Sequence, residues 1–144
     1  MDKWGRKGLV ILFILWLTPG CSPTHQRAEL EAALDLYDHL LLKMDIDSIT
    51  LMYAPDGVLG NEARGRDSIK KFLGTFSRVQ VLFQKSQTSS IDLEDQKAVQ
   101  KGIYNQTAVL NQVDTLKVHG KFESHWIWLP GEGWRIKQME TFPD

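Results

Sequence analysis

The side chains that most often carry catalytic or metal chemistry are few in this sequence, and their spacing predicts no cluster among them. They are one cysteine and four histidines: Cys21, His25, His39, His119 and His125. No two of the histidines stand at a spacing typical of a zinc site. A serine nucleophile needs a histidine base within reach, and the sequence places none beside Ser124. We therefore predict no metal site and no cofactor, and we expect the histidines to be structural or surface groups.

The single cysteine follows a segment with the pattern of a secretion signal. Residues 3–7 contain three basic side chains, and residues 9–17 form the unbroken apolar run LVILFILWL. That run is shorter than the roughly 20 residues that span a bilayer. Residues 18–21, Thr-Pro-Gly-Cys, resemble a bacterial lipobox, in which the cysteine becomes the lipidated first residue. Thr18 stands where lipoboxes usually carry leucine, so an ordinary cleaved signal or an uncleaved anchor is the alternative.

A lipidated Cys21 would make the lipid bilayer the first partner of this protein. Without lipid, an exported chain would be left with one unpaired, reactive thiol. We therefore expect residues 1–20 to be a lipoprotein signal peptide and residues 21–26 a short tether. The protein would be exported and lipid-anchored to the cell envelope. Ser22 follows the cysteine, and by the sorting rule of enteric-type bacteria a residue other than aspartate there favours the outer membrane over the inner.

Charge and cysteine content exclude two classes of protein. The chain has a formal net charge of -1, and residues 1–20 carry three basic side chains and one acidic side chain, which leaves about -3 for the remainder. Nucleic-acid binding needs a basic surface, so we expect no nucleic-acid partner. Because Cys21 is the only cysteine, no internal disulfide can form. A hydrophobic core alone must then stabilise the domain.

Helical periodicity dominates the first part of the predicted domain. Residues 27–44 carry apolar side chains at spacings of three and four, which predicts a helix with one buried stripe: Leu30, Leu34, Tyr37, Leu41 and Met44. Asp45 is a good N-cap for a second, short helix over residues 46–53. A short strand is expected at residues 58–59. A third helix opens at Gly65 and places Ile69, Phe72, Leu73 and Phe76 on one face.

The pattern changes to strands after residue 78. Four stretches alternate or carry strand-forming residues, approximately 79–91, 98–110, 116–129 and 134–142, and turn residues separate them. The third stretch places Phe122, Ser124, Trp126 and Trp128 on one face by its period of two. Helices followed by an antiparallel meander predict one α+β domain over residues 27–144. We expect Leu34, Leu41, Ile69 and Ile136 to be buried in its core.

Three segments in this order resemble the nuclear transport factor 2-like superfamily, including its SnoaL-like and ketosteroid isomerase-like branches. They are Asp-Ile-Asp-Ser-Ile-Thr-Leu-Met-Tyr-Ala-Pro-Asp at 45–56, Gly-Arg-Asp-Ser-Ile-Lys-Lys-Phe-Leu at 65–73 and Gly-Trp-Arg-Ile at 133–136. The likeness covers residues 29–142. It implies a cone, in which a strongly curved antiparallel sheet wraps around three N-terminal helices and leaves a ligand pocket at the open end. Many members of the superfamily dimerise through the outer face of the sheet, so a homodimer is a further expected partner.

The resemblance argues against isomerase activity. Ketosteroid isomerases need a carboxylate base, a tyrosine donor and a protonated acid. Carried over to this sequence, the tyrosines fall on Tyr37 and Tyr53, and a supporting tyrosine falls on Leu73. The base position falls on Asn61 and the acid position on Ser124. An amide is no base at neutral pH and a hydroxyl is no carboxylic acid, so we expect the isomerase reaction to be absent.

Other catalytic arrangements remain alternatives. Asp56 and Glu62 are the carboxylates nearest to the predicted base position, but Asp56 is expected to shape a turn and Glu62 to face water. A working base also needs burial and a partner that tunes its pKa. The dehydratase branch uses histidines with an aspartate, and none of the four histidines here forms an obvious pair. His125 in particular should face the outer side of the sheet.

An aromatic pocket with a few polar groups remains, which is typical of a small-molecule site. Its expected members are Tyr37, Tyr53, Asn61, Phe72, Tyr104, Ser124 and Trp126. The same aromatic side chains can also simply fill the cone as core. Met139 faces the pocket if a bulge follows Ile136, and Gln138 and Glu140 face it otherwise.

The sequence therefore predicts a membrane-anchored extracytoplasmic lipoprotein that binds a small apolar ligand or a protein partner without catalysis. The alternatives are a lyase-, isomerase- or hydrolase-type enzyme acting in the same pocket, or a structural dimeric module of the envelope.

Overall fold

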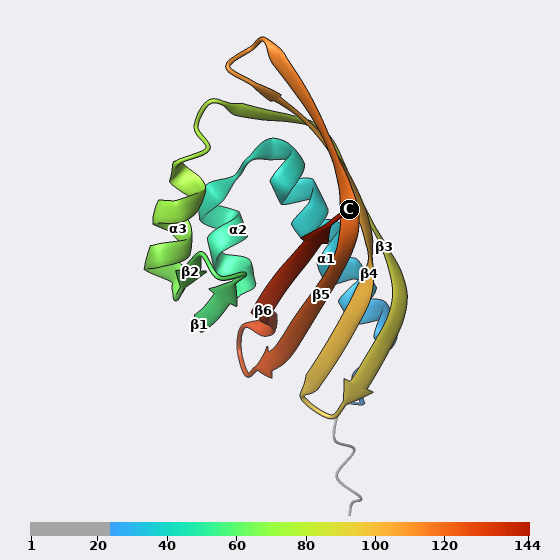
Figure 1. Cartoon of the computed structure of the whole chain (residues 1–144). Coiled ribbons are helices and arrows are strands. Elements are labelled where there is room, and N and C mark those ends of the chain that lie inside the picture. The colour runs from blue at the N-terminus through green and yellow to red at the C-terminus, as the bar shows by residue number, and fades with distance from the viewer. Residues whose placement is uncertain (1–23) are drawn as a thin grey trace, which may run out of the picture.

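The computed structural model describes residues 24–144, which form three helices and one curved sheet of six strands (Figure 1). The helices are α1 (Arg27–Lys43), α2 (Ile46–Met52) and α3 (Arg66–Gly74). The strands are β1 (Tyr53–Leu59), β2 (Ala63–Arg64), β3 (Val79–Glu94), β4 (Lys97–Leu110), β5 (Asp114–Leu129) and β6 (Gly133–Pro143). The predicted α+β class is confirmed. The expected signal peptide and Cys21 lie outside the described residues.

Local sequence signals explain where α1 begins and ends. The Glu29 carboxylate accepts a hydrogen bond from the backbone N–H of Gln26, which satisfies one of the free donors at the start of the helix. At the other end Met44 adopts a left-handed conformation with φ 51°, and its N–H returns to the last turn. None of the helices within residues 24–144 combines the length and apolar composition needed to cross a membrane.

The sheet has the strand order β2-β1-β6-β5-β4-β3 and is antiparallel except where β1 runs parallel to β6. The long strands β3, β4, β5 and β6 form a meander that curves around α1, while α2, α3, β1 and β2 lie together at one edge (Figure 1). Register shifts in β3, one between Val81 and Phe83 and one between Thr88 and Ser90, mark irregular points in the longest strand pair. The predicted curved sheet is therefore confirmed, and it contains one parallel pair that the sequence did not indicate.

The boundary between α2 and β1 differs from the prediction. The short helix ends at Met52, and Tyr53 begins a strand that reaches Leu59 rather than being confined to residues 58–59. Tyr53 pairs with Ile136 of β6, and the register then shifts before Val58, so Pro55 falls within an irregular part of the pairing where no regular ladder bond is needed. Tertiary pairing with β6 thus overrides the helical pattern at Tyr53.

The core lies between the helices and the concave face of the sheet. Leu34, Ile69 and Ile136 are buried as expected, but Leu41 is only half-buried because its side chain lines a cavity. On β6 an extra residue lies after Ile136, since Trp126 pairs with Ile136 and His125 with Gln138. This bulge brings Ile136 and Met139 to the same buried face, so the alternative in which Met139 points inward is the observed one.

Candidate ligand-binding site

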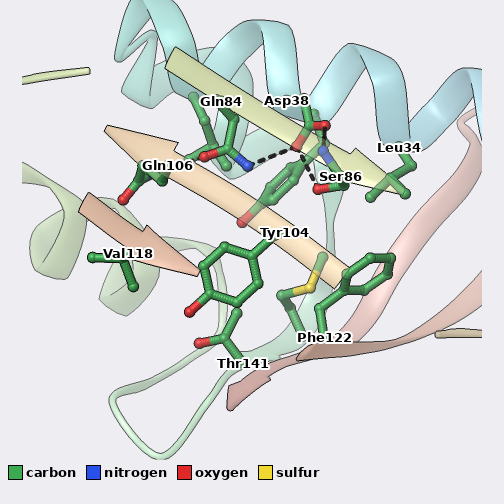
Figure 2. Close-up of a pocket in the computed structure, with 12 residues that line it drawn as sticks. Leu34, Asp38, Gln84, Ser86, Tyr104, Gln106, Val118, Phe122 and Thr141 are labelled. Carbon is green, nitrogen blue, oxygen red and sulfur yellow. Dashed lines mark hydrogen bonds between the residues drawn. The ribbon is translucent and has the colours of Figure 1, made fainter. Parts of the chain in front are cut away.

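A cavity of about 180 Å³ opens between α1 and the concave face of the sheet (Figure 2). Its walls come from α1 and from each of the four long strands. The lining residues are Leu34, Tyr37, Asp38, Leu41, Gln84, Ser86, Tyr104, Gln106, Val118, Phe122, Met139 and Thr141. Apolar side chains alternate with hydroxyl, amide and carboxylate groups, which is the composition expected of a small-molecule site.

Element periodicity explains how these side chains converge. On α1, Leu34, Tyr37, Asp38 and Leu41 stand at helical spacings of three and four, so they form one stripe that faces the sheet. On the strands, cavity residues occur two or four positions apart, as the period of two requires. Pairing then places Gln84 opposite Gln106, and Ser86 opposite Tyr104. One face of one helix and one face of the meander are therefore sufficient to build the cavity.

Two tyrosine hydroxyls meet at the inner side of the cavity. The Tyr37 and Tyr53 oxygens lie 2.8 Å apart, and their rings pack edge to face with centroids 6.1 Å apart. Burial raises the pKa of Tyr37 to about 12 and holds the pKa of Tyr53 well above its ordinary value. Both hydroxyls therefore stay protonated at neutral pH. Tyr53 is fully buried, and its hydroxyl is the partner that satisfies the Tyr37 hydroxyl inside the domain.

Asp38 places a carboxylate in the cavity wall and anchors a chain of hydrogen bonds (Figure 2). It is buried, with 5% of its surface exposed. Ser86 donates to it twice, through its backbone N–H and through its hydroxyl at 2.8 Å. Gln84 donates a further bond at 2.9 Å, and the Gln106 amide donates to Gln84 at 2.8 Å. Three donors thus converge on one carboxylate and connect α1 to β3.

Tyr104 and Thr141 complete the polar part of the wall on β4 and β6. Partial burial raises the pKa of Tyr104, and a hydrogen bond with Thr141 opposes that rise. Phe122 of β5, which pairs with Thr141, and Leu34 of α1 supply apolar surface. A ligand in this cavity would therefore contact both apolar side chains and hydroxyl, amide and carboxylate groups.

Solved structures with the same arrangement of elements decide the fold. A ketosteroid isomerase-like protein from Erwinia carotovora atroseptica superimposes with a TM-score of 0.70 at 15% identity, covering 81% of this chain and 94% of that one. A nuclear transport factor 2 (NTF2-like) superfamily protein from Salmonella enterica gives 0.67 at 20% identity, covering 81% and 89%. The chain has the NTF2-like fold.

A third structural neighbour is a proposed scytalone dehydratase from Novosphingobium aromaticivorans, with a TM-score of 0.70, 15% identity and coverage of 81% of this chain and 83% of that one. No protein-family model and no curated protein sequence matches this chain. At such identities the likeness establishes the NTF2-like fold alone, because unrelated activities share one fold.

The NTF2-like cone brings some of the predicted site residues together and separates others. Tyr37 and Tyr104 line the cavity, and Tyr53 contacts Tyr37. Ser124 and Trp126 are almost fully buried in the core, where the indole N–H donates to the Ser124 hydroxyl at 2.9 Å and that hydroxyl donates to the Gln100 carbonyl at 3.2 Å. Neither side chain lines the cavity, so in this part of the cone the filled-core alternative describes the structure.

Asn61 and Phe72 also lie away from the cavity. Asn61 is exposed in the turn between β1 and β2 and borders two separate hollows at the edge of the sheet, together with Glu62 and Glu140. Phe72 is half-buried on α3, and its ring packs edge to face on Phe76 at 5.2 Å. The residue at the isomerase base position is therefore outside the cavity beside Tyr37.

The alternative carboxylates and the histidines stay outside the cavity as well. Asp56 is exposed and pairs with Lys137, which lowers its pKa, and Glu62 is exposed. His119 pairs with Asp144 at 2.9 Å and His125 with Glu123 at 2.7 Å. His39 is exposed on α1. Residues 24–144 contain no group of three or more histidine, cysteine, aspartate or glutamate side chains placed to hold a metal ion.

His25 is the histidine whose position the sequence did not indicate. His25 was expected to lie in the tether, and its side chain is only 8% exposed. The centroid of its ring lies 4.2 Å from that of the Trp128 ring and 5.0 Å from that of the Trp134 ring. Glu29 accepts bonds from both the imidazole and the Trp134 indole N–H, each at 3.0 Å. The last residues of the expected tether are thus fastened to the start of α1 and to the hairpin that joins β5 to β6.

Sequence reasoning missed the polar half of the cavity, above all Asp38. A signal was available: Asp38 stands four residues after Leu34 and directly after Tyr37, so it falls on the buried stripe of α1. An acid on such a stripe indicates either a strained core or a site, since charged groups are rarely buried without partners. Gln84, Ser86 and Gln106 had no comparable signal, because strand register alone decides which polar residues face inward.

Proposed function

We propose that this protein is an exported, lipid-anchored NTF2-like domain that binds a small apolar ligand in the cavity beside Tyr37, without catalysis. The observation that carries the proposal is the cavity of about 180 Å³ with its apolar wall and few polar groups. A cavity of roughly 150 Å³ is large enough to hold benzene. The site therefore suits compounds of about one aromatic ring, with additional substituents at its open side.

The absence of catalysis rests on the chemistry of the cavity wall. Tyr37 already shares its hydroxyl with Tyr53, and the Asp38 carboxylate is already occupied by three hydrogen bonds from protein groups. The positions that hold base and acid in ketosteroid isomerases are Asn61 and Ser124 here, and neither lines the cavity. An enzyme of lyase, isomerase or hydrolase type is the second candidate, and the carboxylate of Asp38 next to Tyr37 is the observation that favours it.

Membrane anchoring is supported by the N-terminal sequence. A basic start, a short apolar run and a cysteine directly after small residues are the features that lipoprotein signals share. The domain would then act outside the cytoplasm, on the outer membrane if the host is Gram-negative. A protein partner at the mouth of the cone, or a second copy at the outer face of the sheet, is compatible with this placement.

A ligand screen with a filled cavity tests the binding proposal. We would measure thermal unfolding of the purified full-length chain with a set of one-ring apolar compounds. Val118→Trp places a large ring in the cavity wall, and Val113→Trp, in an 80% exposed turn, is the matched control. We expect some of these compounds to raise the unfolding temperature of the wild type and of Val113→Trp, but not that of Val118→Trp. The proposal fails if no compound stabilises the wild type, or if Val118→Trp responds equally.

A further inference from the structure

Asp38 is a buried carboxylate for which the described residues provide no cation. It is 5% exposed, and none of the ion pairs among residues 24–144 includes it. The residues that line the cavity with it include no lysine, arginine or histidine. Lys85, which lies between Gln84 and Ser86 on β3, pairs with the exposed Asp35 at 3.2 Å.

Hydrogen bonds alone therefore compensate the charge of Asp38. Its Oδ1 atom accepts from the Gln84 amide and the Ser86 hydroxyl, and its Oδ2 atom accepts from the Ser86 backbone N–H. A carboxylate offers about four acceptor positions, so the three bonds leave one on Oδ2. Buried charges in proteins are normally paired, because an isolated ion loses its hydration without replacement. The cavity thus holds a negative charge and room for a donor.

We infer that the cavity takes a small apolar amine, whose ammonium group pairs with Asp38 while its apolar body packs against Phe122 and Leu34. This inference rests on the proposed function, since it names the ligand class of the same cavity. An ammonium group supplies the positive charge and the donor that the wall lacks. A carboxylate ligand would face the charge of Asp38 with no basic side chain in the wall to offset it, so the site should reject carboxylic acids of the same size.

A matched set of probes separates charge from shape. Benzylamine, benzyl alcohol and benzoate share one ring and differ in the head group, which at neutral pH is positive, neutral and negative. We would measure their binding to the purified full-length chain by titration calorimetry. We expect benzylamine to bind about ten-fold more tightly than benzyl alcohol, because hydrogen bonds to charged groups are stronger than those between neutral groups. Benzoate should bind most weakly.

Two variants assign the effect to Asp38. Asp38→Asn removes the charge inside the cavity, and Asp35→Asn removes one from the exposed side of the same helix. Asp38→Asn should abolish the preference for benzylamine and leave benzyl alcohol binding within about two-fold, and Asp35→Asn should keep the wild-type order. If Asp38→Asn does not fold, the ratio of the benzylamine and benzyl alcohol affinities, measured in the wild type and in Asp35→Asn, still decides whether the cavity prefers the amine.

The possible outcomes separate this inference from the proposed function. Equal affinity for benzylamine and benzyl alcohol, or tightest binding of benzoate, would show that Asp38 only ties α1 to β3, and the amine inference would be overturned while ligand binding stands. Binding of none of the three probes, together with a negative ligand screen, would overturn the proposed function and this inference with it.

Discussion

At the scale of single residues, the buried hydroxyls of Tyr37 and Tyr53 depend on each other for a hydrogen-bond partner. Each hydroxyl is buried and has the other as its partner at 2.8 Å. Removing one hydroxyl leaves the other without a partner, which costs about 1–3 kcal/mol, whereas removing both is less costly than the sum. Tyr37→Phe, Tyr53→Phe and the double variant should therefore show a favourable coupling of about 1 kcal/mol in denaturant unfolding. Strictly additive losses would contradict the pairing.

Burial of the same tyrosines makes the domain sensitive to alkali. The ordinary tyrosine pKa is 10.0, and that of Tyr37 is raised to about 12 in the folded state. Between these values the unfolded chain releases a proton that the folded chain keeps, so the free energy of unfolding falls as the pH rises from 10 to 12. The loss from Tyr37 should be on the order of 2 kcal/mol. Unfolding measured across this range should be less pH-dependent in the Tyr37→Phe/Tyr53→Phe double variant than in the wild type.

Residue type and element periodicity together predicted part of the cavity. Tyr37 and Tyr104 were found because aromatic residues with a hydroxyl stand at inward positions of a helix and a strand. Ser124 and Trp126 also point inward, yet they form a hydrogen bond with each other and are packed in the core. Whether an inward residue meets a void or a neighbour depends on three-dimensional packing, which periodicity does not encode.

At the scale of elements, the close approach of β4 to β3 depends on the missing side chain of Gly102 in β4. A Cβ atom there would lie 2.0 Å from the Gln87 carbonyl oxygen and 2.7 Å from the Phe122 ring. The Gln87 oxygen is backbone and cannot move aside as a flexible side chain would. Gly102→Ala should therefore cost about 3 kcal/mol or more in denaturant unfolding.

A second glycine provides the control for that substitution. Gly74, the last residue of α3, has open space where a Cβ atom would lie. Gly74→Ala should leave stability unchanged or raise it slightly, because alanine loses less entropy on folding. Similar losses in both variants would show that β4 and β3 do not approach as closely as the structure places them.

Element types were predictable because the apolar periodicity is strong, whereas their ends were set by tertiary contacts. Helix α1 follows its own stripe and caps, and its bounds agree with the sequence within one residue. Tyr53 was expected in a helix and lies in a strand, since β6 offers it a pairing partner. Arg66 reinforces this conformation by donating to the Tyr53 carbonyl at 2.9 Å while it also pairs with Glu132. No sequence period reveals a contact between such distant segments.

At the scale of the whole molecule, lipidation of Cys21 is the prediction that decides where the protein acts. Cys21→Ala should remove the lipid mass from the mature protein and release it from the membrane fraction to the soluble fraction. Mass spectrometry and fractionation check the two results separately. Ser22→Ala, which keeps the cysteine, serves as the control and should remain with the membrane. An unchanged distribution of the Cys21→Ala protein would contradict the anchor.

The global fold was predictable even though no single motif was decisive. Three weak segments in the right order indicated the cone, because order and spacing reflect how the helices and the meander must be connected. The parallel contact of β1 with β6 and the polar wall around Asp38 were not predictable in the same way. Both depend on which residues approach each other after the sheet has curved.

The packing of His25 against Trp128 and Trp134 has a consequence for reach and orientation. Four residue steps separate Cys21 from His25, and an extended chain spans at most about 3.6 Å per step, or roughly 14 Å in all. A membrane-anchored domain could therefore neither rise far from the bilayer nor turn over freely. The tryptophan end would stay near the lipid headgroups, while Val118 and Thr141, toward the opposite ends of β5 and β6, would point outward. Ligands would then arrive from the aqueous compartment rather than sideways from the lipid.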